Sequence, residues 1–325
     1  MHNVANRDAD VITISASGAN AGYVNFWDRQ IWASDCSTIK SNDDNTINIR
    51  YVYEVLCSMQ NVVFDLQKGN AQPHVYIDDI KKIQFPIPPI DIQKRIVKDI
   101  DKIENNRLET ELKLTQLNRR ISGIIDEIET PDIMTIQDVC SIKITDGTHQ
   151  TPTYCNKKEG VPFISSKDVT TKKINWDENS IKYIIPELHE KLYKRIAPQR
   201  DDVLLAKNGT IGVAALVETD RIFDIYVTLA VLRPNKQLIL PKYLLYIVNS
   251  DLCNKQFNES IQKGMGVPNL HLNKIQTVKI PVPNLREQKE IITQIDELEK
   301  QITEAQAIIN NSKQQKQEIL DKYLL

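Results

Sequence analysis

The chain has 325 residues, of which 41% are hydrophobic and 26% charged, and its formal net charge is −2 at pH 7. This composition is typical of a globular protein with two domains of ordinary size. The net charge excludes an overall positive charge that would attract nucleic acid, although a local basic patch would be enough to bind it. The five cysteines form no Cys-x-x-Cys pair and no apolar run reaches about 18 residues, so we expect a reduced cytoplasmic location and no membrane contact.

The first 88 residues predict a small mixed unit. Val11–Ile14 and Tyr23–Phe26 are rich in strand-forming residues and flank a glycine-containing turn. Residues 50–68 have helical spacing, and residues 69–83 predict a loop with a short strand. The prolines from Pro86 onward end this unit, because proline and its predecessor resist continued helix or sheet pairing.

Residues 89–130 predict one long helix. Its apolar positions follow alternating steps of four and three, which is a coiled-coil seam with polar interruptions at Arg107 and Thr110. The seam consists of Ile96, Ile100, Ile103, Arg107, Thr110, Leu114, Leu117, Ile121, Ile124 and Ile128.

Residues 131–284 predict a second globular unit, and residues 285–325 a second long helix. The unit opens with a segment that has no counterpart in the first half. Val203–Ala206 then predicts a strand, Lys207–Gly209 a turn, and Ile211–Ala214 the returning strand. Leu238–Phe257 has helical spacing. The last helix repeats the seam with Ile291, Ile295, Leu298, Ile302, Ala305, Ile309, Ser312, Lys316, Ile319 and Tyr323.

The two halves of the chain are related by a constant offset. Pro281 and Pro86 differ by 195, as do Gln288 and Gln93, while Asp202 matches Asp10 with about one residue of slippage. The duplication predicts an α+β fold, in which two globular domains are joined by two long helices that form an antiparallel coiled coil with pseudo-two-fold symmetry. Two amphipathic helices that each pack on their own domain remain an open alternative.

Motifs for catalysis, cofactors and metals are missing from the sequence. It contains no phosphate-binding loop, dinucleotide fingerprint, zinc-protease motif or nucleophile elbow, and its five histidines lack metal-ligand spacing. The triplet Asp79-Ile80-Lys81 would suit a metal-dependent nuclease, but such triplets are frequent by chance. We therefore expect no enzyme activity, cofactor or metal in this chain alone.

The order of unit, helix, unit, helix resembles the specificity subunit of type I restriction–modification systems. The resemblance covers nearly the whole chain and is carried by residues 146–152 (DGTHQTP), 161–169 (VPFISSKDV) and 202–212, by the two Pro-x-Pro…Gln-Lys segments, and by residues 108–112 (LETEL). It implies two target recognition domains that each read one half of a bipartite site in double-stranded DNA. Methyltransferase subunits, which hold S-adenosylmethionine, and translocating restriction subunits would supply the chemistry.

The first unit departs from the family pattern. It lacks about 65 residues that precede the duplicated part of the second unit, so residues 1–88 are expected to be a partial target recognition domain. The chain would then be a truncated gene product, a cassette from a rearranging locus, or a half that a second chain completes. Its strands would lack partners, which predicts unpaired edges and exposed apolar surface that favour association. Hydrogen exchange should then show weaker protection in residues 8–68 than in residues 135–257.

Polar side chains on loops of the second unit are candidates for DNA contact, because base edges and phosphates need hydrogen-bond donors and cations. The candidates are Thr148, His149, Gln150, Lys167, Lys207, Asn208, Thr210 and Lys263. Each has a plainer alternative: a structural turn at 147–150, a solvated lysine at 167 and 263, and backbone geometry around Gly209 and Gly212.

Two functions follow from these expectations. In the first, the chain reads DNA and scaffolds the methyltransferase and nuclease subunits. In the second, it is a coiled-coil assembly or decoy protein that binds methyltransferase subunits without reading DNA, which the incomplete first unit favours.

Overall fold

The computed structural model describes residues 4–69, 71–261 and 268–324. The chain divides into two compact units: residues 1–114 with 303–325 form unit 1, and residues 115–302 form unit 2. Both long helices contribute a part to each unit. The boundaries at residues 88, 130 and 284, which separate globular parts from helices, remain our proposal for the domain organisation.

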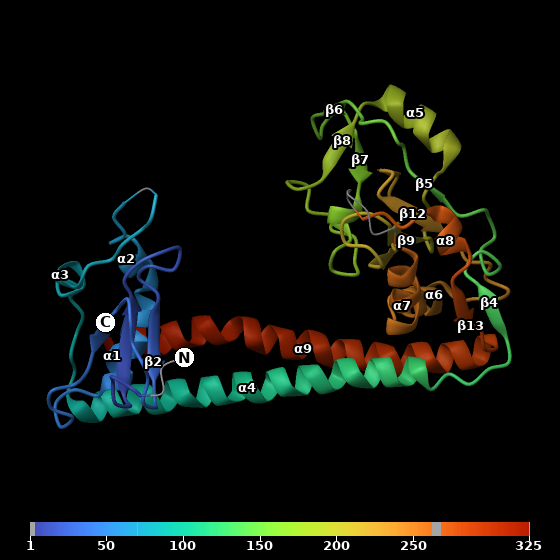
Figure 1. The fold of residues 1–325 in the computed structure, drawn as a ribbon. Coiled ribbons are helices and arrows are strands. Elements are labelled where there is room, and N and C mark those ends of the chain that lie inside the picture. Colours follow the sequence, from blue (N-terminus) through green and yellow to red (C-terminus); the bar gives the residue numbers. More distant parts are fainter. Residues whose placement is uncertain (1–3, 70, 262–267, 325) are drawn as a thin grey trace. The chain divides into compact units, whose positions relative to one another are not determined.

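Unit 1 contains a three-stranded antiparallel sheet in the order β2-β1-β3 (Figure 1). The strands are β1 (Val11–Ser15), β2 (Val24–Trp27) and β3 (Cys36–Ile39). The helices are α1 (Ile49–Ser58), α2 (Gln60–Phe64), α3 (Ile77–Ile80) and α4 (Ile90–Asp126), the last of which continues into unit 2. Residues 69–83 hold the short helix α3 in place of the short strand expected from the sequence. In the described part of this segment, His74 forms isolated bridges with Ser17 and Lys68.

Unit 2 contains a larger set of strands and short helices. The strands are β4 (Ile133–Thr135), β5 (Thr145–Asp146), β6 (Tyr154–Cys155), β7 (Val161–Ile164), β8 (Lys182–Ile184), β9 (Val203–Ala206), β10 (Ala214–Leu216), β11 (Asp224–Ile225), β12 (Leu229–Leu232) and β13 (Lys279–Pro281). The helices are the 3-10 turn η1 (Ser166–Asp168), α5 (Pro186–Arg195), α6 (Pro241–Val248), α7 (Asp251–Ser260), α8 (Leu272–Gln276) and α9 (Leu285–Leu324), which continues into unit 1. The returning strand β10 starts at Ala214, later than expected.

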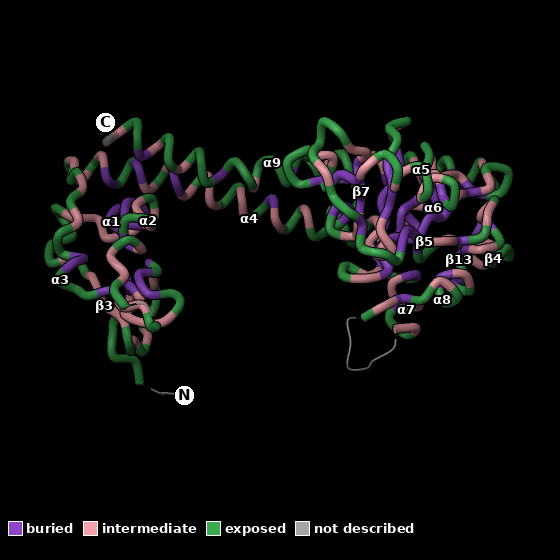
Figure 2. Tube along the Cα trace, turned by 90° about the horizontal axis from the view of Figure 1, so that it is seen from above, coloured by how far each residue is buried: buried purple, intermediate pink, exposed green. Residues whose placement is uncertain are grey.

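Two four-stranded sheets position the functional loops of unit 2. One has the order β10-β9-β12-β5 and the other β11-β7-β8-β6. Apolar side chains of β9 and β12 alternate between two cores: Val203 and Leu205 pack with α6 and α7, while Leu204 and Val231 pack with the second sheet. Figure 2 shows buried residues gathered in the interior of unit 2, around β5 and β7. The sheet β10-β9-β12-β5 is therefore buried on both faces.

The helices α4 and α9 pack as an antiparallel pair within each unit. In unit 1, the start of α4 meets the end of α9, where Ile96 and Ile100 share a core with Leu320 and the Lys316 Nζ atom lies 2.6 Å from Glu104 Oε2. In unit 2, the end of α4 meets the start of α9, where Ile125 packs with Ile295. Every described position of the two predicted seams is buried or half-buried, which confirms the seams.

A buried glutamine repeats the same three hydrogen bonds in both units. Gln288 accepts from the Leu240 amide at 2.8 Å and donates to the carbonyls of Leu238 at 2.9 Å and Pro283 at 2.8 Å. Gln93 makes the same set with residues 48, 46 and 88 at 2.8, 2.9 and 2.7 Å. Each side chain fixes the start of its long helix to the N-terminus of a short helix, α1 in unit 1 and α6 in unit 2, and the duplication is confirmed at atomic detail.

The structure also shows which residues correspond in the glycine-containing turns, where the offset between the two halves differs from 195. Gly18 and Gly209 have φ values of +81° and +75°, and Gly22 and Gly212 share +88°. Asp10 and Asp201 both have positive φ, at 57° and 74°. The strand registers therefore align Asp10 with Asp201, one residue from the expected partner Asp202.

The sheet of unit 1 has a polar face where unit 2 has an apolar one. In unit 2, the residues of this face lie under the second sheet: Leu204, Ala206, Ala215, Val217, Leu229 and Val231. When the strand registers of the two sheets are aligned, the equivalent positions in unit 1 are Thr13, Ser15, Asn25, Trp27, Cys36 and Thr38. The Trp27 indole donates to Thr13 Oγ1 at 2.8 Å. Contrary to the expectation of exposed apolar surface here, the sequence of unit 1 suits a sheet without a second layer.

The outer edge of β3 does match the expectation of a missing partner. In unit 2 the corresponding strand β12 pairs with β5 through Ala230 and Val231. Among the strands of the described residues, β3 pairs only with β1. None of the helices in the described part of the chain has the length and hydropathy that a membrane crossing requires.

Candidate nucleic-acid interface

Loops that follow four different strands converge in unit 2. They are residues 147–150 after β5, 165–167 after β7, 207–210 after β9 and 226–228 after β11. The Ser166 amide donates to Thr228 Oγ1 at 3.0 Å, and the Lys207 amide donates to the Thr228 carbonyl at 2.9 Å. Thr148 forms a parallel bridge with Tyr226. Three loops that carry sequence-predicted candidates therefore belong to one surface.

The packing and the backbone of these loops require glycine at two positions. A Cβ atom on Gly147 would lie 2.0 Å from the Ile225 carbonyl oxygen, which is far inside any contact distance. Gly209 is required by its backbone, since its φ of +75° is disfavoured for residues with a side chain. Both glycines therefore serve the backbone geometry of the loop cluster. For Gly209, this is the alternative to DNA contact that the sequence left open.

A buried carboxylate lies beneath the loops and gathers three basic side chains. Asp146 is 3% exposed, and its Oδ1 atom lies 2.9 Å from the Arg195 guanidinium and 3.2 Å from His149 Nε2. Its Oδ2 atom lies 3.3 Å from Lys207 Nζ. One negative charge thus faces two permanent positive charges and an imidazole, so the cluster carries surplus positive charge.

The sequence-predicted candidates differ in their accessibility. His149, Gln150 and Thr210 are exposed, and the Thr210 hydroxyl lies 3.4 Å from the Ser166 carbonyl. Lys167 is also exposed, and its Nζ atom donates to the Ser180 carbonyl at 3.2 Å.

The remaining candidates serve the packing of the loops or lie outside the described residues. Thr148 is 9% exposed, and its hydroxyl accepts from the Gln150 amide at 3.2 Å. Asn208 is half-buried and pairs through its backbone with Asn269. Lys263 lies outside the described residues.

Lys207 lies in the interior of the loop cluster. Its side chain is 6% exposed, and its ammonium neutralises the Asp146 carboxylate. Burying an unpaired charge is costly, so this pair fixes the two strand ends to each other. We therefore propose that Lys207 positions the loops, in place of the direct phosphate contact expected from the sequence.

Sequence reasoning missed Asp146 and Arg195 as members of the site. Arg195 is the last residue of α5, a helix with no buried residue. The helix is held at two points: Arg195 contacts Asp146, and His189 Nδ1 lies 2.6 Å from Asp224 Oδ2. Burial raises the pKa of the Asp224 carboxyl, and the contact with His189 opposes that rise. The exposed Lys and Arg residues of an amphipathic helix gave no signal of this contact.

Unit 1 keeps the loop backbone but lacks the charged cluster. The Ala16 carbonyl accepts from the Val75 amide at 2.9 Å, as the Lys207 carbonyl accepts from Leu270 at 2.8 Å. Ala16 therefore stands where unit 2 has Lys207, so among the described residues of unit 1 this position carries a small apolar side chain in place of a cation.

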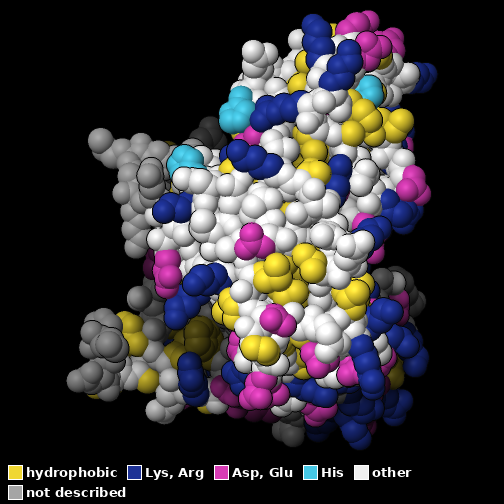
Figure 3. Space-filling model, turned by 90° about the vertical axis from the view of Figure 1, so that its right-hand side faces the viewer, with side chains coloured by type: hydrophobic (Ala, Val, Ile, Leu, Met, Phe, Trp, Pro, Cys, Tyr) yellow, Lys and Arg dark blue, Asp and Glu magenta, His cyan; other side chains and the backbone are white. Residues whose placement is uncertain are grey.

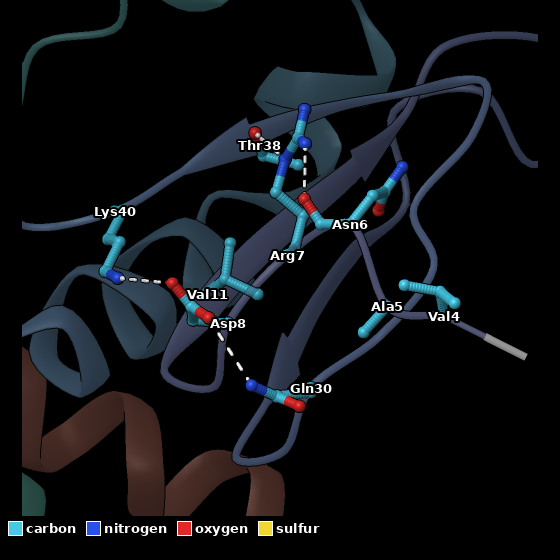
Figure 4. A pocket seen from close by; sticks show the side chains of 9 residues that line it. All are labelled: Val4, Ala5, Asn6, Arg7, Asp8, Val11, Gln30, Thr38 and Lys40. Carbon is cyan, nitrogen blue, oxygen red and sulfur yellow. Dashed lines mark hydrogen bonds and ion pairs between the residues drawn. The ribbon is translucent and has the colours of Figure 1, made fainter.

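A separate hollow in unit 1 carries mixed charge (Figure 4). Its lining includes Arg7, Asp8, Gln30, Thr38 and Lys40. The Arg7 guanidinium donates to Thr38 Oγ1 at 3.3 Å, and Asp8 lies 3.7 Å from Lys40. Among the described residues of either unit, no group of three His, Cys, Asp or Glu side chains is arranged to hold a metal ion.

Known proteins of one class are similar to this chain in sequence and in fold. The family model of the type I restriction modification DNA specificity domain matches residues 3–119 and 129–314. The MjaVIII specificity subunit of Methanocaldococcus jannaschii is 22% identical over 299 residues, which cover 84% of this chain and 68% of that protein. The EcoBI specificity subunit of Escherichia coli is 21% identical over 325 residues, covering 86% of this chain and 68% of that protein.

Two solved structures show the same fold. The S subunit of a type I restriction–modification system from M. genitalium has a TM-score of 0.58 at 14% identity, and the match covers 99% of this chain and 85% of that one. A chain from a study of complex assembly and conformational transition of the type I R-M system has a TM-score of 0.62 at 18% identity, covering 98% and 82%.

The match over both units shows that the chain belongs to the family of type I restriction modification DNA specificity domains. Its relatives are specificity subunits, which recognise DNA and are not catalytic, because catalysis comes from other subunits of the system. This confirms the resemblance, the fold class and the non-enzymatic role predicted from the sequence.

Proposed function

We propose that this chain reads one half of a bipartite DNA site through the loop cluster of unit 2 and scaffolds the methyltransferase and restriction subunits that act there. The observation that supports it best is the convergence of loops 147–150, 165–167 and 207–210 over Asp146, with surplus positive charge. Loops of this kind present the donors and acceptors that base-edge readout needs. His149, Gln150 and Thr210 are the exposed residues for this contact, and Lys167 is a further cation for phosphate.

The helix pair is the scaffold in this proposal. Exposed apolar residues lie outside the predicted seams in unit 1: Leu108, Leu112 and Ile308 are 46%, 66% and 43% exposed. Apolar surface of this kind favours protein contact. We assign the docking of partner subunits to these helices, and the site of action to the cytoplasm, where such systems work.

Within the described residues of unit 1, the outer edge of β3 supports a second chain that completes the unit. The outer edge of β3 offers unpaired backbone groups, which another strand could pair. The polar sheet face of unit 1 argues against a second buried layer, because burying Thr13, Asn25 and Thr38 would leave polar groups without partners. We therefore propose that unit 1 folds without a second sheet.

Co-purification followed by DNA binding tests the function. The chain is expressed with its methyltransferase subunits, and the complex is titrated with DNA carrying the site that the cells methylate. We expect specific binding, and a Gln150→Ala variant with binding weakened by a factor of ten or so, since removal of one base contact costs about 1–3 kcal/mol. Gln237→Ala, an exposed glutamine of the same unit, is the matched control.

Assembly without any DNA binding by the complex would instead support a coiled-coil assembly or decoy protein. The isolated chain should neither methylate nor cleave DNA. Turnover that persists after stringent denaturation and refolding of the chain would contradict its non-enzymatic role.

A further inference from the structure

An open basic groove lies beside the loop cluster in unit 2. It is lined by Ile142, Lys143, Ile144, Thr145, Tyr193, Lys194, Arg195, Ile196, Ala197, Arg233, Leu272, Asn273 and Gln276. Among the described residues that line it, four have basic side chains and none is acidic. Figure 3 shows Lys, Arg and His side chains on the upper part of one face, with Asp and Glu side chains at its top edge. The groove volume of about 840 Å³ lies within the range of roughly 300–1,000 Å³ that ligand sites occupy.

The acidic partners of the groove are buried beneath it. Arg233 is paired with Asp202, which is fully buried, through Nε–Oδ1 contact at 2.8 Å. Arg195 shares the carboxylate of Asp146 with Lys207 and His149. These two carboxylates hold the floor of the groove in place without exposing negative charge to a ligand.

Two lysines on the rim of the groove lack acidic partners. Lys143 and Lys194 are exposed, and within the described part of the chain neither contacts an acidic side chain. They belong to separate elements, the turn before β5 and the end of α5, which Arg195 joins through Asp146. The lining also offers the neutral donors Asn273 and Gln276. This arrangement suits an extended anion with several phosphates, because each cation and donor can meet a different oxygen.

We propose that this groove binds the phosphodiester backbone of the DNA whose bases the loop cluster reads. The inference rests on the proposed function and extends it. Arg195 links the two surfaces, since the carboxylate that orients it also holds His149 of the recognition loop. Backbone binding in the groove fixes the position of the duplex, and the loops then discriminate sequence. Lys143, Lys194 and Arg195 are the contact residues, and Asp146 is a positioning residue.

Salt-dependent binding tests the proposal. The full chain in complex with its methyltransferase subunits is titrated with target DNA and with a scrambled duplex over a series of salt concentrations. The double variant Lys143→Gln/Lys194→Gln disrupts no internal ion pair, so it should fold normally. We expect the slope of log K against log salt to fall by about 0.9 for each phosphate that the variant no longer neutralises. The decrease in affinity should be similar for both duplexes, since phosphate contacts carry no sequence information.

Two further variants separate charge from geometry. Arg195→Lys retains the charge and should keep most of the slope, whereas Arg195→Gln should lower it. Lys255→Gln, an exposed lysine on α7 outside the groove, should bind as the unaltered chain does. An unchanged slope and affinity in the double variant would overturn the groove proposal, as would a decrease confined to the target duplex. If the unaltered complex binds no DNA at all, the proposed function itself fails, which is a different result.

Discussion

Replacing Gln288 by methionine should destabilise unit 2 strongly, although the two side chains have similar length. Gln288 is fully buried, and the change removes three hydrogen bonds, leaving the amide of Leu240 and the carbonyls of Leu238 and Pro283 without partners. Each unsatisfied buried group costs about 1–3 kcal/mol, so we expect a loss of roughly 3–6 kcal/mol after partial relaxation. That is a large part of the 5–15 kcal/mol that stabilises an ordinary domain.

Denaturant unfolding, together with hydrogen exchange in each unit, measures the effect. The repeat supplies a matched variant, because Gln93→Met removes the same three bonds from unit 1. Each substitution should raise exchange mainly in its own unit. Gln306→Met, on the exposed side of α9, should change the free energy of unfolding by less than about 0.5 kcal/mol. A loss below about 1 kcal/mol for both buried glutamines would refute the reasoning.

Three further changes test other parts of the structure. Gly147→Ala should weaken DNA binding by shifting the loop, since the new Cβ meets the Ile225 carbonyl at 2.0 Å, and a complex that binds as before would contradict this. The Arg107 guanidinium lowers the pKa of Glu104 to about 2, so the stability that Glu104 contributes is present above about pH 4.3 and lost as the pH falls toward 2. The difference in unfolding free energy between the unaltered chain and Glu104→Gln should shrink over that window, and a constant difference would argue against the ion pair. Insertion of one four-residue turn within Glu109–Leu112 adds about 6 Å, so in a complex with two working recognition domains the gap between half-sites should grow by roughly one or two base pairs with the half-sites unchanged.

Elements with strong local signals were predicted well from the sequence. The constant offset of 195 located α3 and α8, and α4 and α9, at matching positions. The seams were predictable because a coiled coil leaves its spacing in the sequence, and β1 and β9 because buried strands are rich in branched residues. The start of β10 was placed too early, since the glycines that precede it continue the turn up to Val213.

The second sheet of unit 2 had no comparable signal. Its strands are short, and β11 pairs in parallel with β7 from about 60 residues away, through Asp224 with Phe163 and Ile225 with Ile164. Pairing at that distance is decided by which apolar surfaces the sheets bury, and hydrophobic spacing alone does not reveal it. The polar face of the unit 1 sheet could be interpreted only after the strand registers were known.

The sequence was enough to predict which loops form the site, but not which of their charged side chains would pair with one another. The sequence marked residues 147–150 and 207–210 because they are polar and rich in glycine. It did not show that Asp146 would lie under Lys207, which converts a surface cation into an internal one. Arg195 was missed because the residue that orients it is 49 positions away.

Sequencing of methylated sites in cells that carry the system tests the central claim most directly. Cells with the unaltered chain are compared with cells carrying Gln150→Ala/Thr210→Ala, two exposed positions on the recognition loops of unit 2. We predict a bipartite methylated site with the unaltered chain, and loosened sequence requirements in one half of it with the variant, at the same spacing. An identical methylated site in both strains, or equal changes in both halves, would contradict recognition by the loop cluster of unit 2.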